Sequence, residues 1–161
     1  MKKEEYHFAF EVYDSAEELS KEDAWLVNEA RSVTEGAYAP YSNFNVGAVA
    51  KMTNGEIVAG TNQENASYPA GLCAERVLLS SAATLYPNVA IDAIAISYNN
   101  SNGYSNHPIS PCGICRQSLS EYEERTNKPI RLILSGMEGK VFIIQKSSWL
   151  LPLSFGSMDL K

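Results

Sequence analysis

Apolar and polar positions alternate along residues 6–13, where every second residue is aromatic or valine, and this pattern predicts a β-strand. Ser20 followed by Asp23 resembles a helix-capping signal. Residues 21–38 are therefore predicted to form a helix that ends before Pro40. The chain is thus expected to begin with a strand and a helix.

The next part of the chain has two apolar runs, residues 45–52 and 56–61, which are joined by Thr-Asn-Gly. An Asn-Gly pair between two such runs is a strong signal for a β-hairpin. Residues 72–86 place their apolar side chains on one helical face and are closed by a proline, which predicts a helix. Residues 91–98 are almost wholly apolar and predict a buried strand.

The last third of the chain starts with a long polar loop at residues 99–110. A helix is predicted over residues 113–125, strands over 130–135 and 140–145, and a short turn or helix near Trp149. This order of elements predicts an α/β fold, a three-layer domain with a mixed sheet.

Composition limits the class of protein. The chain has 161 residues, 45% hydrophobic and 20% charged, which suits one globular domain. Thirteen basic residues against nineteen acidic ones give a net charge of −6, which disfavours nucleic acid as a partner and favours a small molecule. No apolar run approaches the roughly 20 residues of a membrane span. The N-terminus lacks a signal-peptide pattern, so a cytoplasmic location is expected.

Three cysteines carry the candidate chemistry. Cys73 lies at the start of one predicted helix, and Cys112 and Cys115 lie one turn apart at the start of another. An odd number of cysteines in a reducing compartment favours metal binding or catalysis over disulfides. Zinc accepts thiolates and prefers four ligands, so three cysteines leave one position for water and predict a catalytic rather than a structural zinc site.

Two alternatives bear on this prediction. The histidines, His7 and His107, lack ligand spacing to a cysteine, although His107 would close the site if its loop folded back. A lone C-x-x-C could be a thioredoxin-like redox pair. The third cysteine opposes this, because C-x-E with P-C-x-x-C matches the zinc deaminase signature with Cys as the first ligand.

Two residues close to Cys73, Glu75 and Arg76, are candidates for roles in the chemistry of the zinc site. Three thiolates and one Zn²⁺ leave a net charge of −1, which weakens the acidification of water. Helix N-termini, and Arg76 as a donor to a sulfur, would offset this, although Arg76 could equally form a surface ion pair. Glu75 can approach the water without binding the metal and can carry its proton. The alternative is a Glu stabilised by the helix dipole.

With these motifs in place, the chain resembles the small three-cysteine cytidine deaminases of pyrimidine salvage. The matching segments occur in the family order, are specific, and span most of the chain. They are Tyr-Ala-Pro-Tyr-Ser-Asn-Phe at 38–44, Asn-Gln-Glu-Asn-Ala-Ser-Tyr at 62–68, Cys-Ala-Glu-Arg at 73–76, Ser-Pro-Cys-Gly-Ile-Cys-Arg-Gln at 110–117, and Leu-Pro at 151–152 followed by Phe155. As a member, the chain would be one domain over residues 1–161, a three-layer α/β/α sandwich around a mixed five-stranded sheet. About residues 1–20 would be an N-terminal extension that adds an extra strand.

The resemblance implies one Zn²⁺ per subunit, bound by the three cysteines, with Glu75 as the proton shuttle. It implies that Asn62 and Glu64 hold the ribose hydroxyls and that the Ala74 N–H binds the 2-carbonyl of the base. The implied aromatic contacts are Phe44 in the pocket, Tyr68 at the pocket or subunit interface, and Phe155 from a neighbouring subunit. The family is homotetrameric, so active sites shared between subunits are expected.

The implied reaction is hydrolytic deamination of cytidine or 2′-deoxycytidine to uridine or 2′-deoxyuridine and ammonia. A carboxylate such as Glu64 at the sugar would repel a phosphate, which favours a free nucleoside. Two rivals remain open. One is a deaminase of an aminonucleoside antibiotic, such as a blasticidin S deaminase. The other is a non-enzymatic, zinc-stabilised binding protein, which would need a fourth protein ligand.

Overall fold

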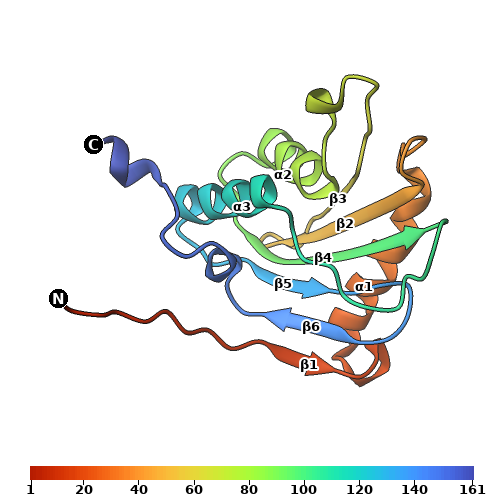
Figure 1. The fold of residues 1–161 in the computed structure, drawn as a ribbon, viewed down its shortest axis with the longest axis horizontal. Coiled ribbons are helices and arrows are strands. Elements are labelled where there is room, and N and C mark those ends of the chain that lie inside the picture. Colours follow the sequence, from red (N-terminus) through yellow and green to blue (C-terminus); the bar gives the residue numbers. More distant parts are fainter.

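A six-stranded mixed sheet forms the middle layer of the computed structural model, which describes residues 1–161 (Figure 1). The strand order is β1-β6-β5-β4-β2-β3, and only β4 and β5 run parallel. The strands are β1 (Glu11–Tyr13), β2 (Phe44–Met52), β3 (Ile57–Thr61), β4 (Ile91–Asn100), β5 (Arg131–Leu134) and β6 (Val141–Ile144). The expected mixed sheet of five strands with one added at the N-terminus is confirmed.

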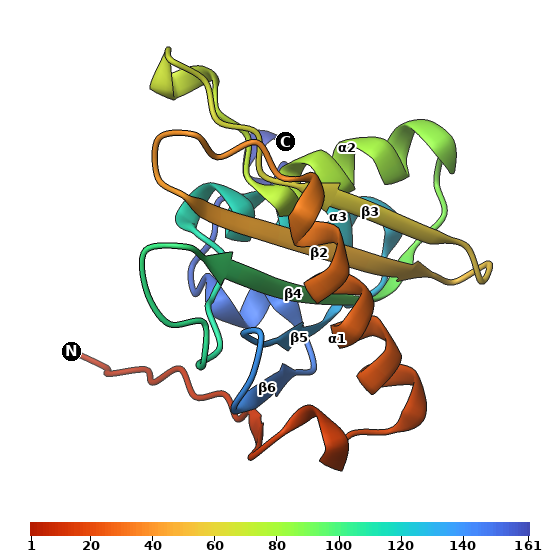
Figure 2. The same ribbon diagram turned by 90° about the vertical axis from the view of Figure 1, so that its right-hand side faces the viewer.

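Three helices cover the two faces of this sheet. They are α1 (Lys21–Val33), α2 (Ala74–Leu85) and α3 (Gly113–Thr126). Figure 2 shows α1 alone on one face, with α2 and α3 beside each other on the opposite face. The predicted three-layer sandwich is therefore correct. None of the helices has the length and hydrophobicity that crossing a membrane requires.

The central strand β4 contributes to both cores. Ile94 and Ile96 pack in the larger cluster with α2 and α3, whereas Ala93 and Ala95 pack against α1. Successive side chains of a strand point to opposite faces, so a strand covered on both sides is apolar without interruption. This is why residues 91–98 show no alternation of apolar and polar positions.

The predicted first helix is too long. Ser20 caps α1 as expected, because its hydroxyl accepts a hydrogen bond from the Asp23 N–H (3.1 Å). The α-helix ends at Val33, however, and a 3₁₀ turn follows over Thr34–Gly36. The Thr34 hydroxyl donates to the Arg31 carbonyl (2.7 Å), and such local bonding competes with helix propagation.

The N-terminal strand is shorter than its pattern suggests. Only Glu11–Tyr13 pair with β6, and residues 1–10 form no strand. The aromatic side of the segment nevertheless faces the protein. The Phe10 ring lies 5.0 Å from the ring of Phe142, and the Tyr6 hydroxyl donates to the Trp149 carbonyl (3.0 Å). The alternating apolar residues therefore make contacts with the rest of the chain but stay about half exposed, and only β1 forms sheet pairs.

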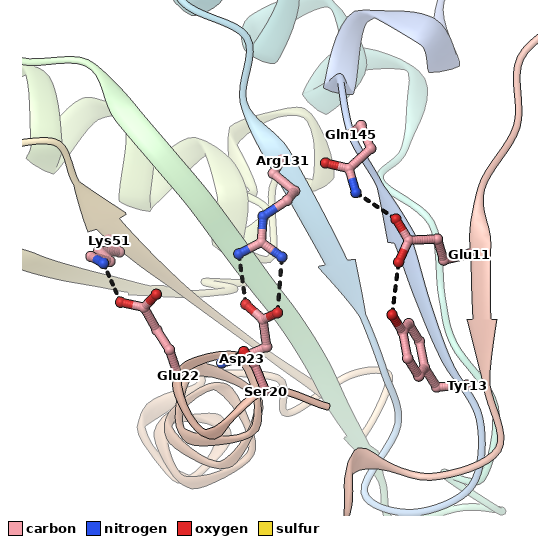
Figure 3. A network of polar contacts seen from close by, with 8 residues as sticks. All are labelled: Glu11, Tyr13, Ser20, Glu22, Asp23, Lys51, Arg131 and Gln145. Carbon is pink, nitrogen blue, oxygen red and sulfur yellow. Dashed lines mark hydrogen bonds and ion pairs between the residues drawn. The ribbon is translucent and has the colours of Figure 1, made fainter. Parts of the chain in front are cut away.

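A polar network joins the start of α1 to the sheet (Figure 3). Arg131 of β5 donates two hydrogen bonds to the carboxylate of Asp23, at 3.0 and 2.6 Å. Both side chains are largely buried, and the Asp23 contact raises the pKa of Arg131. Figure 3 also shows Glu22 paired with Lys51 of β2. These ion pairs fix the first turn of α1 against neighbouring strands.

A close approach of α2 to β3 sets the position of the first turn of α2. A Cβ atom at Gly60 would lie 2.5 Å from the Ala74 carbonyl oxygen and 2.5 Å from the Leu78 nitrogen. Only glycine leaves room for the backbone of α2 at this distance. The N-terminus of α2 therefore sits directly on the sheet, next to the N-terminus of α3.

Candidate metal centre

The three cysteines come together at the N-termini of α2 and α3. Cys73 precedes the first residue of α2, and Cys112 precedes the first residue of α3. The Sγ atoms of Cys73 and Cys112 lie 3.7 Å apart, and those of Cys112 and Cys115 lie 3.4 Å apart. All three sulfurs lie within 4.8 Å of one another. The fold thus unites residues that are 39 positions apart in the sequence.

This arrangement of sulfurs fits a zinc ion. Two thiolates on a tetrahedral zinc, with Zn–S bonds of about 2.3 Å, lie about 3.8 Å apart, close to the spacing of these sulfurs. The only cluster of potential ligands contains these three residues and no fourth. His107 is hydrogen-bonded to Tyr98 and is not in the cluster. The site therefore offers zinc three ligands and one open position, as catalytic sites do.

The ionisation of the thiols also points to a cation. Hydrogen bonding with Cys115 is the main reason that the pKa of Cys73 is lowered to about 6. The same interaction, with burial, raises the pKa of Cys115. Two neighbouring thiols whose pKa values move in opposite directions compete for one negative charge, and a cation is what allows both to be thiolates. A divalent metal provides that balance.

Glu75 lies in the first turn of α2 and is 95% buried, since only 5% of its surface is exposed. It lines the same cleft as Cys73 and Cys112 without joining the sulfur cluster. Burial raises the pKa of its carboxyl group. A buried carboxyl with a raised pKa beside an open metal position is suited to accepting and returning a proton.

The two helix starts supply the electrostatic setting that the sequence predicts. The first-turn N–H groups of a helix point toward its N-terminus, where Cys73 and Cys112 lie, and neither cysteine side chain makes a capping hydrogen bond to them. Arg76 donates no hydrogen bond to a sulfur in this structure, although its charge contributes to the lowered pKa of Cys73. Its side chain lines a shallow groove between α2 and α3.

Arg116 supports the metal site in a way that sequence reasoning missed. Its Nε donates to the Pro111 carbonyl (2.9 Å), and its Nη1 donates to the Leu150 carbonyl (3.0 Å). Pro111 directly precedes Cys112, so Arg116 holds the segment that carries a ligand. A signal was present: side chains in a helix point toward its N-terminus, and Arg116 is four residues after Cys112.

The cleft beside the cysteines has a volume of about 370 Å³, within the range of small-molecule sites. Cys73, Ala74 and Glu75 form one part of its lining. Other predicted contact residues that line it are Asn62, Glu64 and Tyr68. Phe44 and Phe155 are not among the lining residues of this chain.

Asn62 and Glu64 are already held by backbone groups. The Oδ1 of Asn62 accepts from the Val46 N–H (2.7 Å), and its Nδ2 donates to the Phe44 carbonyl (2.9 Å). One oxygen of Glu64, Oε2, accepts from the N–H groups of Tyr41 (2.9 Å) and Ser42 (3.3 Å). The hydrogen bonds to the 41–42 turn lower the pKa of Glu64. Each side chain keeps hydrogen-bonding capacity for a ligand.

The predicted aromatic residues occupy different settings. The ring of Phe44 stacks on Tyr98, with centroids 4.8 Å apart. Tyr68 projects from a 3₁₀ turn and is 75% exposed, and Phe155 is 59% exposed. The side chain of Gln117, on α3, donates to the Phe155 carbonyl (2.8 Å). Tyr68 and Phe155 thus present aromatic surface to the outside of this chain.

Comparison with known proteins agrees with this geometry. Residues 20–128 match the family model described as the cytidine and deoxycytidylate deaminase zinc-binding region. The chain is 38% identical over 135 residues to a cytidine deaminase of Halalkalibacterium halodurans, covering 84% of this chain and 95% of that protein. It is 36% identical over 104 residues to a cytidine deaminase of Mycoplasma genitalium, covering 65% and 75%. The crystal structure of cytidine deaminase from Burkholderia pseudomallei superposes with a TM-score of 0.71 at 36% identity, covering 85% and 100%.

Proposed function

The chain belongs to the cytidine and deoxycytidylate deaminase family, and we propose that its cleft hydrolytically deaminates a free cytidine-type nucleoside. Cytidine or 2′-deoxycytidine is converted to uridine or 2′-deoxyuridine with release of ammonia. The observation that carries this conclusion is a cluster of three sulfurs whose members Cys73 and Cys112 line one cleft together with the buried Glu75. A three-sulfur site with an open position, next to a buried acid, is suited to hydrolysis and lacks the fourth ligand of a structural zinc site.

In this proposal Cys73, Cys112 and Cys115 hold the zinc ion. When bound, zinc supplies the Lewis acidity that makes water nucleophilic near neutral pH and stabilises developing negative charge. Glu75 would accept one proton as water adds to C4 of the base and pass it to N3, and would then take the remaining proton from the new C4 hydroxyl and pass it to the leaving amino group. The raised pKa of Glu75 suits both steps. Atoms balance, because water enters and ammonia leaves.

The opposite part of the cleft selects the sugar. Asn62 has one amide hydrogen and one lone pair left for a ribose hydroxyl, and Glu64 has its Oε1. Because its pKa is lowered, Glu64 is an anion at neutral pH. An anion beside the sugar disfavours a nucleotide phosphate, and the net charge of −6 acts in the same direction.

The base and its aromatic surroundings complete the proposal. The Ala74 N–H, in the first turn of α2, has no helical acceptor and would bind the 2-carbonyl of the base. Phe44 does not line the cleft in this chain, but from the start of β2 it would approach the bound base. Arg76 would support the sulfurs once the metal is bound. The exposed Tyr68 and Phe155 would reach a neighbouring copy, in a homotetramer whose active sites are shared.

A substrate panel tests the proposed function. The purified protein is analysed for metal and then incubated with cytidine, 2′-deoxycytidine, CMP and blasticidin S, while ammonia release and the ultraviolet absorbance of the base are followed. We expect about one zinc per chain and ammonia from the two nucleosides but not from CMP. A zinc-loaded protein that releases no ammonia from either nucleoside would refute the proposal. Faster ammonia release from blasticidin S than from the nucleosides would instead identify an aminonucleoside antibiotic as the substrate.

A further inference from the structure

A chain of contacts leads from the exposed His107, in the loop between β4 and α3, through the buried Tyr98 to the sugar end of the cleft. The Tyr98 hydroxyl is hydrogen-bonded to Nδ1 of His107 (3.2 Å), and the two rings meet edge to face at 5.7 Å. Tyr98 is only 1% exposed, and its ring lies nearly parallel to that of Phe44, with an interplanar angle of 15°. A stack of this kind fixes the orientation of Phe44.

The backbone of Phe44 then connects to Asn62. The Phe44 carbonyl accepts from Nδ2 of Asn62, and the Val46 N–H donates to its Oδ1. Both Val46 and Asn62 line the cleft. Since the Asn62 amide is bonded on both sides to this end of β2, a shift of Phe44 moves the remaining hydrogen-bonding groups of Asn62 as well.

The loop that carries His107 is anchored on two sides. A Cβ at Gly136 would lie 2.3 Å from the Ser105 carbonyl oxygen and 3.0 Å from that of His107, so the loop packs tightly on the turn between β5 and β6. On the other side, Asn102 Nδ2 donates to the Ser42 carbonyl (3.0 Å). These two contacts fix the loop that places His107 next to Tyr98.

We propose that His107 is a positioning residue that acts through Tyr98 and Phe44 to place Asn62 for the sugar of the substrate. The inference rests on the proposed function, because it assigns Asn62 to the sugar. The positioning role of His107 differs from a purely structural role in one respect. The contact chain ends at the sugar side and includes no group of the metal centre, so its loss should weaken substrate binding and leave the chemical step intact.

Four variants and one matched control test this proposal in the full-length, zinc-loaded protein. His107→Ala removes the ring, Tyr98→Phe removes only the hydroxyl, and a double variant combines both changes. His107→Gln keeps a side chain that can hydrogen-bond to Tyr98. His7→Ala is the control, because His7 is the only other histidine and contacts only Glu5 at the exposed N-terminus. Zinc content and thermal midpoint are measured for each.

Steady-state kinetics with cytidine and 2′-deoxycytidine provide the readout. We expect His107→Ala and Tyr98→Phe each to raise KM about tenfold while kcat stays within about twofold of wild type. The double variant should be no weaker than either single variant, because both remove one interaction. His107→Gln should recover most of the loss, and His7→Ala should match wild type.

The outcomes separate the two proposals. Unchanged KM in both single variants, or a fall in kcat together with lost zinc, would overturn the positioning role while leaving the deaminase function in place. Additive effects in the double variant would also overturn it, because His107 would then act independently of Tyr98. A zinc-loaded wild-type protein that releases no ammonia from either nucleoside would remove the proposed function, and the positioning role with it.

Discussion

Adding one methyl group at Gly60 should disturb both the stability and the metal site. The Cβ of Gly60→Ala would lie 2.5 Å from two backbone atoms of α2, whereas ordinary contacts begin at 3.4 Å. The first turn of α2 must therefore move by about 0.9 Å away from β3, since backbone cannot rotate aside as a side chain can. Overpacking of this kind costs about 1–3 kcal/mol of unfolding free energy.

The same movement displaces Cys73 and Glu75, which lie at the start of α2. We expect Gly60→Ala to lower the denaturant midpoint, to lose zinc to a chelator faster than wild type, and to lower kcat. Gly36→Ala is the matched control, because its Cβ would meet only the Thr61 methyl at 3.8 Å. Equal stability, zinc retention and turnover in the two variants would refute the argument that this contact positions the metal site.

Three further predictions concern the metal centre and the network in Figure 3. Glu75→Gln should keep zinc and the fold but lower kcat about 10²–10⁴-fold, and near-normal turnover would contradict its role as proton carrier. Cys115→Ser should reduce bound zinc well below one per chain by metal analysis. In a double-mutant cycle on urea unfolding, Asp23→Asn and Arg131→Gln should show a coupling energy of about 1–3 kcal/mol, because their bidentate contact is largely buried. Additive losses would show that the pair does not stabilise α1.

The sequence pattern predicted most of the helices and strands, because the spacing of apolar residues and the turn residues between them are visible within each short segment. The hairpin between β2 and β3 follows from its Asn-Gly turn, where Gly55 has a φ of +90°. The predicted boundaries of the N-terminal strand and of the first helix are wrong, because contacts outside the apolar pattern determine where these elements begin and end. The N-terminal strand begins only at Glu11, where the pairing with β6 begins, and α1 stops at Val33, where the Thr34 hydroxyl bonds back to the helix.

The candidate site was predictable to the extent that spacing and resemblance name its residues. Cys112 and Cys115 are one helical turn apart, so their shared direction follows from sequence. The arrival of Cys73 beside them depends on the contact between Gly60 and α2, which no periodicity reveals. The same limit applies to Phe44, whose ring stacks on Tyr98 of the neighbouring strand.

Arg76 and Arg116 both lie in the first turn of a helix that starts at a cysteine, but their side chains have different partners. Arg76 is predicted to donate to a sulfur because it adjoins the cysteine motif, but it lines the groove between α2 and α3. Arg116 received no role, yet it hydrogen-bonds the carbonyl before Cys112. Helical side chains lean toward the N-terminus, so the fourth residue after a capping position reaches back over the preceding loop. Arg116, four residues after Cys112, does so, whereas the side chain of Arg76, three residues after Cys73, makes no such hydrogen bond in this structure.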